Sequence, residues 1–411
     1  MRRRRPPGLS GPASAWRVLR RRDFGFYFVG NGASASGTWF QNLAGSIYVF
    51  RETHSVFLLG VLNFSQFIPI LLLAPWAGAA ADRFDRRRLL LITQTVSAAL
   101  SGILAVLAWS DLVRVWVVIV FSGLIGIGSA FSSPAQTALV ASLVPREDVA
   151  QAVALNSMTF NLARAVGPAS ATGVIALFGI PAAFAVNSLS FLVLVAALVV
   201  IAPRPYTRGR VRVSPRGSFS LVRGNPRLLL FLLMGAAACF ASDPVNTESP
   251  ALAHAFGMSD TWAGALPGLF GAGGVAAALL SGGSIGGSSR RAAMRLGLLG
   301  VGVALFASSP SFVLGVAFLA LGGFGYLSSN SFAMSRLQLD VEDSQRGRMM
   351  ALWSVAFLGL RPVASLADGS LATTFGVRVA AATLAVPALV VAALAARRLT
   401  AHDALDAARS G

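Results

Sequence analysis

The sequence predicts an all-α polytopic membrane protein with twelve transmembrane helices in two six-helix bundles. Apolar residues make up 55% of the 411 residues and charged residues 12%, about half the charged fraction of a soluble protein. Runs of roughly 20 mostly apolar residues recur along the chain, and a helix needs that length to cross a bilayer. The longest hydrophilic stretch, residues 202–227, separates six such runs from six. Duplicated halves of this kind are typical of secondary transporters.

Each apolar run is long enough for one helix, and polar joints separate neighbouring runs. Glycine, proline and serine mark tight turns at residues 178–181, 308–310 and 375–377, which suits antiparallel neighbours. We place the spans at about 24–49, 56–81, 89–109, 113–136, 150–177, 180–202, 228–250, 259–284, 292–308, 311–334, 348–376 and 377–396.

Arginine supplies all 34 basic residues, and its distribution predicts the orientation. If alternate joints face the same side, that side and both termini hold 29 arginines, whereas the other side holds Arg51, Arg114 and Arg378. Cytoplasmic loops are enriched in basic residues, so both termini are predicted to be cytoplasmic. The net charge of +18 is therefore interpreted as a topology signal, and no nucleic-acid partner is expected.

This organisation divides the chain into five parts. We predict a basic cytoplasmic tail at 1–23, an N-terminal bundle at 24–202, a flexible cytoplasmic linker at 203–227, a C-terminal bundle at 228–396 and a cytoplasmic tail at 397–411. No cleavable signal peptide is expected, because the first apolar run begins after Arg22 and is too long.

The sequence offers no chemistry typical of an enzyme. It lacks a G-x-x-x-x-G-K-[ST] phosphate loop, so ATP is not expected to drive the protein directly. Cys239 is the single cysteine, and His54, His254 and His402 are scattered, which leaves no metal-ligand spacing and no nucleophile–base pair. We expect neither catalysis nor a cofactor nor a bound metal.

The joint between the second and third spans, residues 78–88, reads GAAADRFDRRR. This G-x-x-x-D-R-x-x-R-R pattern resembles the signature loop of major facilitator superfamily transporters, and the form ADRFDRRRLL is similar to their drug and siderophore exporters, either enterobactin-exporter-like or macrolide-efflux-like. The resemblance extends to Gly167-Pro168 in span five and, with a weaker fit, to residues 346–348. Asp85 departs from the pattern, which more often has a small residue there. The resemblance implies a monomeric transporter of the bacterial plasma (inner) membrane.

Gating residues are expected in this loop and in the two other motif regions. A glycine at a helix end allows another helix to approach closely, and Asp82 can accept hydrogen bonds from a facing helix N-terminus. Such contacts would hold the cytoplasmic ends of the halves together in one state and break in the other. The alternatives are that the arginines only enforce topology and that the Gly-Pro pair only allows close packing. The predicted gating residues are Gly78, Asp82, Arg83, Arg86, Gly167, Pro168, Arg346 and Arg348.

Spans five and eleven each place an arginine near the middle of the membrane. Arg164 shares one helix face with Ser157 and Asn161, at spacing i, i+4, i+7. A membrane-buried arginine costs at least about 2.5 kcal/mol, so it should face protein or water and have a partner. In span eleven Asp368 lies about 10 Å beyond Arg361, too far for direct pairing.

Two such arginines in corresponding helices predict a central cavity that attracts an anionic or carbonyl-rich substrate. The alternative is that each arginine pairs with a buried carboxylate. Polar residues of spans one and seven are expected to line the same cavity. The predicted substrate-binding residues are Arg164, Arg361, Asn161, Ser157, Asn31, Thr38, Asn42 and Asn246.

Span seven supplies the acids. Asp243 shares a face with Asn246 and Thr247, about 22 Å from the cytoplasmic end, whereas Glu248 is expected to point elsewhere, at the outer surface. A carboxylate in a low-dielectric cavity is easier to protonate and can carry a proton through alternating access. Asp243 is the first candidate for proton coupling and Asp368 the second. The alternative is that both lie in water at the outer end of their helices.

The sequence thus predicts proton-coupled export, by antiport, of an amphipathic small molecule such as a drug (hence multidrug efflux) or a siderophore-like metabolite. An uptake carrier or facilitator of organic anions would use the same arginines in the opposite direction. A membrane sensor or assembly protein is the third possibility, for which replacing both arginines should leave the phenotype unchanged.

Overall fold

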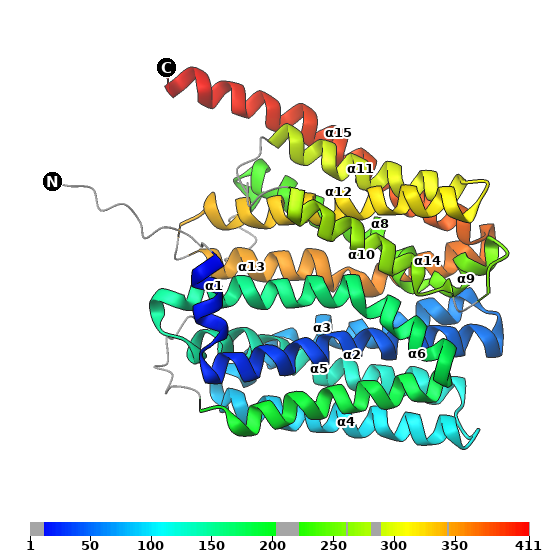
Figure 1. Cartoon of the computed structure of the whole chain (residues 1–411). Helices are drawn as coiled ribbons and strands as arrows, with labels where there is room; N and C mark the ends of the chain where they lie inside the picture. Colours follow the sequence, from blue (N-terminus) through cyan, green and yellow to red (C-terminus); the bar gives the residue numbers. More distant parts are fainter. Residues whose placement is uncertain (1–11, 203–221, 260–261, 281–288, 343–344, 411) are drawn as a thin grey trace.

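The computed structural model describes residues 12–202, 222–259, 262–280, 289–342 and 345–410, which fold as long helices joined by short turns (Figure 1). Residues 1–11 of the predicted N-terminal tail and residues 203–221 of the predicted linker lie outside the described residues. The helices run side by side along one direction, with the first half of the chain in the lower part of the view and the second half in the upper part.

The first half begins with a short helix and continues with long helices whose starts are capped by side chains. Ser55 accepts a hydrogen bond from the backbone N–H of Leu58, and Asp85 accepts one from the backbone N–H of Arg88. Asp85 therefore caps a helix at the position where it departs from the family pattern. The elements are α1 (Pro12–Leu19), α2 (Arg22–Thr53), α3 (Val56–Arg83), α4 (Arg86–Trp109), α5 (Val115–Leu143), η1 (Arg146–Asp148) and α6 (Val149–Val200).

The element α6 contains two spans. Gly179 adopts a positive φ of 83°, a conformation that L side chains rarely take, and Pro181 follows it. The helix therefore breaks at this glycine and the chain reverses direction (Figure 1). This confirms the tight turn predicted at residues 178–181.

In the second half a proline interrupts one of the spans. Residues Val355–Gly359 form a π turn just before Pro362, which has no N–H to donate to the carbonyl four residues earlier. The span therefore consists of two α-helical parts joined by a wider turn. The elements are α8 (Pro226–Thr247), α9 (Ser249–Ala255), α10 (Ala265–Leu280), α11 (Ser289–Ser308), α12 (Phe312–Leu339), α13 (Arg346–Ser354), η3 (Val355–Gly359), α14 (Arg361–Phe375) and α15 (Val377–Ser410).

The described helices correspond to the twelve predicted spans, and residues 260–261 and 281–284 of the eighth lie outside the described residues. Nine helical segments are long and apolar enough to cross a membrane, and one of them is α6, which crosses twice because of its break at Gly179. The polar-rich helix α2 and the 16-residue apolar helix α10 complete the set. The prediction of an all-α membrane protein with twelve spans is confirmed.

Each half has its own apolar core, and two helix pairs make the most extensive contacts between the halves. One core cluster is built from residues 222–395, and the others are built almost wholly from residues 18–201. Across the interface α6 packs against α10, and α3 packs against α14. We call the end at which α2 begins and α15 finishes in Figure 1 the termini end, and the opposite end the far end.

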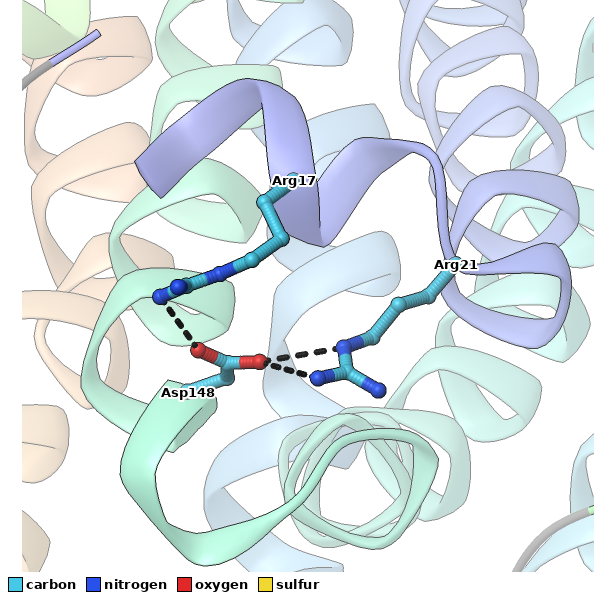
Figure 2. A network of polar contacts seen from close by, with 3 residues as sticks. All are labelled: Arg17, Arg21 and Asp148. Atoms are coloured by element: carbon cyan, nitrogen blue, oxygen red, sulfur yellow. Dashed lines mark hydrogen bonds and ion pairs between the residues drawn. The ribbon is translucent and has the colours of Figure 1, made fainter. Parts of the chain in front are cut away.

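An ion-pair cluster attaches α1 to the termini end of the first half (Figure 2). Asp148 is 3% exposed, and one of its oxygens accepts a hydrogen bond of 3.2 Å from Arg17. Its other oxygen accepts hydrogen bonds from Nε and Nη2 of Arg21, at 3.0 and 2.7 Å. Charge-assisted bonds of this kind fix orientation as well as adding stability, so α1 is docked on η1 by this carboxylate.

We expect Asp148→Asn to destabilise the protein by about 1–2 kcal/mol, because the two guanidinium groups lose their charged partner. The melting temperature of the purified protein would report the loss. Glu147→Gln is the matched control, since Glu147 is the adjacent acid and is exposed. Equal melting temperatures for the two variants would contradict the docking role of Asp148.

Candidate functional site

Arg164 reaches across the interface between the halves. It lies on the first span of α6, and its Nη1 donates a hydrogen bond of 2.5 Å to the hydroxyl of Tyr326 on α12. Its guanidinium carbon lies 4.8 Å from the centre of the Tyr326 ring and 6.0 Å from that of Trp39 on α2, within the range of cation–π attraction. The prediction that Arg164 has a protein partner is confirmed, and the partner is a tyrosine rather than an acid. A cavity of about 10 Å³ beside this pair has room for roughly one water molecule.

Arg361 makes the reciprocal contact from the second half. It begins α14, and its guanidinium carbon lies 4.4 Å from the centre of the Phe67 ring on α3. It is also close enough to Asp243 on α8 for their charges to interact. Both arginines are also close enough to Cys239, one turn earlier on α8, for their charges to interact with its thiol group. The two arginines therefore approach α8 from opposite halves of the molecule.

Three carboxylates are buried toward the far end. Asp243 is 1% exposed and accepts hydrogen bonds from Thr247, at 2.9 Å, and from Ser365 on α14, at 3.1 Å. Asp368 and Glu248 are 0% exposed, and among the described residues neither carboxylate has a hydrogen-bond partner. The alternative that Asp243 and Asp368 lie in water is excluded by this burial.

The position expected for Glu248 is wrong. Helical projection along span seven placed its side chain at the outer surface, but α8 ends at Thr247 and α9 begins at Ser249. The chain turns at Glu248, so the projection no longer applies and the side chain is enclosed.

The polar stripe of span one divides between two neighbouring helices. Asn31 donates a hydrogen bond of 3.0 Å to Asn156 on α6, and Ser34 donates one of 3.3 Å to Gln94 on α4. Asn31 and Ser34 are buried inside the first half, so this conformation does not bring the whole stripe to the two arginines. Asn42 accepts a hydrogen bond from Gln66 of α3, and Thr38, Ser157 and Asn246 each donate to a carbonyl of their own helix.

Part of the loop motif at the termini end lies open to solvent. No atom lies within 4 Å of a Cβ built on Gly78, and Asp82 and Arg83 are exposed without a hydrogen bond or ion pair among the described residues. Arg86 donates to the carbonyl of Ala138 within the same half. Among the described residues, Gly78, Asp82 and Arg83 form none of the predicted gating contacts between the halves in this conformation. Their gating role stays a prediction. Arg348 is half-buried, and the side chains of Asn161 and Arg346 lie outside what the structure describes.

The halves meet closely at the far end instead. A Cβ on Gly60 of α3 would lie 2.5 Å from the carbonyl oxygen of Ser365 on α14. A Cβ on Gly264, just before α10, would lie 2.6 Å from the carbonyl oxygen of Pro168 on α6. Only glycine permits backbones to approach this closely. The far end is therefore closed by tight helix–helix packing.

Gly167, the neighbour of Pro168, packs beside Arg164. A Cβ on Gly167 would lie 2.8 Å from the ring of Trp39, which itself flanks the Arg164 guanidinium. The absence of a side chain thus lets α2 and α6 approach at the level of the arginine. This contact fits the close-packing alternative, and the gating role stays a prediction.

Sequence reasoning did not identify the aromatic partners of the arginines. Tyr326 carries one weak signal, because a tyrosine inside an apolar span has a hydroxyl that needs a partner. Phe67 is one of 27 phenylalanines and carries no signal of its own. These partners depend on how the two halves dock, which single-helix periodicity does not contain.

The helical fold described above is that of a membrane transporter of the major facilitator type. The family model described as "Transmembrane secretion effector" (MFS_3) matches residues 13–410. The chain therefore belongs to this family of membrane transporters, and it is not an enzyme.

Relatives of known name are bacterial transporters. The chain is 34% identical over 160 residues to the staphyloferrin A transporter of Staphylococcus aureus, covering 39% of this chain and 40% of that protein. It is 26% identical over 210 residues to macrolide efflux protein A of Streptococcus pyogenes, covering 49% and 52%. It is 28% identical over 328 residues to the enterobactin exporter EntS of Shigella boydii, covering 75% of each. The chain thus spans about half or less of the length of the first two relatives.

Solved structures share the fold at low sequence identity. A bacterial homologue of the human lysosomal transporter Spinster, inward-facing and unoccupied, matches with a TM-score of 0.69 at 15% identity, over 95% of this chain and 98% of that one. A D-xylose–proton symporter matches with the same TM-score at 17% identity and the same coverage. These likenesses establish the fold and nothing finer.

We expect Gly60→Ala to open the far end, because the added methyl group would clash with the Ser365 carbonyl and separate α3 from α14. Spin labels at Leu112 and Val313, exposed far-end positions in the two halves, would measure the change as a longer distance.

The labels require a background in which the native Cys239 is replaced by alanine. Gly78→Ala is the matched control, since a methyl group there meets open space and should leave the distance at its wild-type value. An unchanged distance in the Gly60 variant would show that another contact holds the far end closed.

Proposed function

We propose that this protein exports an amphipathic small molecule, drug-like or siderophore-like, in exchange for protons. The observation that carries the proposal is the pair of mid-membrane arginines, Arg164 and Arg361, each of which contacts an aromatic side chain of the opposite half. In transporters built from two repeats the cargo binds between the halves near the midplane, and the halves then move about it.

The chemistry around the arginines supports an anionic or carbonyl-rich cargo with apolar parts. The guanidinium group of Arg164 lies against the rings of Tyr326 and Trp39. That of Arg361 lies against the ring of Phe67, so in this conformation both charged groups contact aromatic rings. A cargo with a carboxylate, phenolate or carbonyl group would replace the weaker aromatic contact with a charge-assisted hydrogen bond. The aromatic rings would then pack against its apolar part.

The names of the relatives support this class of cargo. They include a transporter of staphyloferrin A, a macrolide efflux protein and an enterobactin exporter. Siderophores are rich in oxygen ligands for a hard cation, and macrolides are large apolar rings with polar groups. Both fit a site that combines guanidinium groups with aromatic faces.

The arginine distribution supports cytoplasmic termini in a bacterial plasma membrane. With that orientation the far end faces outward, so the conformation described above is closed to the outside, and the loop motif lies on the cytoplasmic side. Cargo would enter from the cytoplasm in this state. The protein would work as a monomer, and protons would be carried by buried carboxylates, with Asp243 and Asp368 as candidates.

The proposal is tested by efflux from bacterial cells that lack their own exporters for the panel compounds. Cells preloaded with macrolides or catecholate and citrate siderophores should lose at least one compound faster when the protein is present, and a protonophore should abolish the difference. Accumulation instead of loss would assign an uptake carrier. No change for any compound would favour a sensor or assembly protein.

We expect Arg164→Gln and Arg361→Gln each to slow the initial efflux rate about tenfold or more, the effect of about 1.4 kcal/mol of lost cargo binding. Arg88→Gln is the control, because Arg88 is an exposed arginine in the first turn of α4 with the same charge. Export at the wild-type rate by the Arg164/Arg361 double variant would contradict the proposed cargo site, provided that membrane levels of the variants match.

A further inference from the structure

Two of the three acids buried toward the far end have no hydrogen-bond partner among the described residues. Asp243 has hydrogen bonds from Thr247 and Ser365 and the nearby charge of Arg361. Glu248 and Asp368 have none of these, although all four of their carboxylate oxygens are buried. An ionised carboxylate enclosed without hydrogen bonds or a counter-charge is strongly disfavoured, whereas a protonated one is tolerated.

We propose that Glu248 and Asp368, rather than Asp243, are the paired proton carriers of this transporter, and that Asp243 is the ionised partner of Arg361. This inference rests on the proposed function, which it makes specific. The charges of Glu248 and Asp368 interact with each other and with that of Asp243. When Asp243 is ionised, its negative charge opposes ionisation of the other two acids. Each of the two would therefore hold a proton in this conformation.

Two other titratable or charged groups near the far end have contacts elsewhere. His254 on α9 places its ring 6.0 Å from that of Phe50. Arg378 on α15 donates to the carbonyls of Ser309 and Ala255, and its guanidinium carbon lies 4.0 Å from the centre of the Phe256 ring. No group of three acidic, histidine or cysteine residues in the described part of the chain has the arrangement of a metal site, so protons rather than a metal cation fit the pair.

Both members of the pair lie beside contacts that close the far end. Gly369 follows Asp368 directly, and a Cβ on Gly369 would lie 3.2 Å from the Cα of Phe57 on α3. Glu248 directly precedes α9, whose His254 packs against Phe50 of α2. Separation of the halves at the far end would break both contacts and admit water to both carboxyl groups. Each carboxylate can then take one proton from that water, and closure encloses the neutral acid.

Infrared difference spectroscopy of the reconstituted full-length protein tests the proposal without any cargo. The C=O stretch of a protonated carboxyl is separate from the amide bands and shifts in D2O. We expect wild-type protein at neutral pH to show two such bands, of which Glu248→Gln removes one and Asp368→Asn the other. Asp243→Asn, the matched control at the third acid, should leave both.

The wild-type spectrum keeps the test independent of variants that fail to fold: both bands should be lost as the pH is raised, in two successive steps, because ionisation of one acid opposes ionisation of the other. Absence of protonated bands at neutral pH, or survival of both bands in Glu248→Gln or in Asp368→Asn, would overturn the assignment. So would loss of the bands when NaCl replaces choline chloride, because sodium would then be the bound ion. If the bands are present but the protein exports nothing, the proposed function is contradicted and this inference is not. If export is sensitive to a protonophore but the bands are absent, this inference is contradicted and the proposed function is not.

Discussion

An ionised side chain in the apolar interior of a membrane protein must find a protein partner or water, and this requirement organises the interface between the two halves. Arg164 and Arg361 each satisfy it across the interface, the first with Tyr326 and the second with Phe67. Because the partners belong to the opposite half, any relative motion of the halves changes the environment of both charges. The interactions of the two arginine charges therefore depend on how the two halves are arranged.

The interface between the halves is tightly packed at the far end and less closely packed around the loop motif at the termini end. Glycine lets α3 meet α14 and lets the start of α10 meet α6 at the far end, while Asp82 and Arg83 at the termini end make no hydrogen bond or ion pair among the described residues. The buried acids lie next to the packed region, where the closing contacts of Gly60 and Gly369 are made. A change that opens the far end would thus act on the acids and the arginines together.

The sequence predicted most of the fold because the membrane requirement is local. Each span needs an apolar run of sufficient length, so the twelve segments and the turn at Gly179 follow from composition and punctuation alone. Spacing within one helix also predicted correctly that Asp368 does not pair with Arg361. Periodicity failed at Glu248, since it assumes a continuous helix and the chain turns there.

The site was predicted less completely, because its contacts join residues far apart in the sequence. The need of Arg164 for a partner was evident, but the identity of Tyr326 depends on the docking of two bundles, and so does the choice of an aromatic partner over an acid. The stripe beginning at Asn31 shares one helix face, yet that face is divided between contacts to α4 and α6. Helical spacing shows which residues share a face and does not show which neighbour covers it.

The coupling between Arg164 and Tyr326 is the most direct test of the central claim that mid-membrane arginines join the halves. A double-mutant cycle with Arg164→Gln, Tyr326→Phe and the pair, read as the melting temperature of the purified protein, isolates their interaction. The account predicts that the double variant loses clearly less than the sum of the two single losses, since both remove the same hydrogen bond. Strictly additive losses would show that the two side chains do not stabilise each other, and the contradiction would extend to the proposed link between charge and conformation.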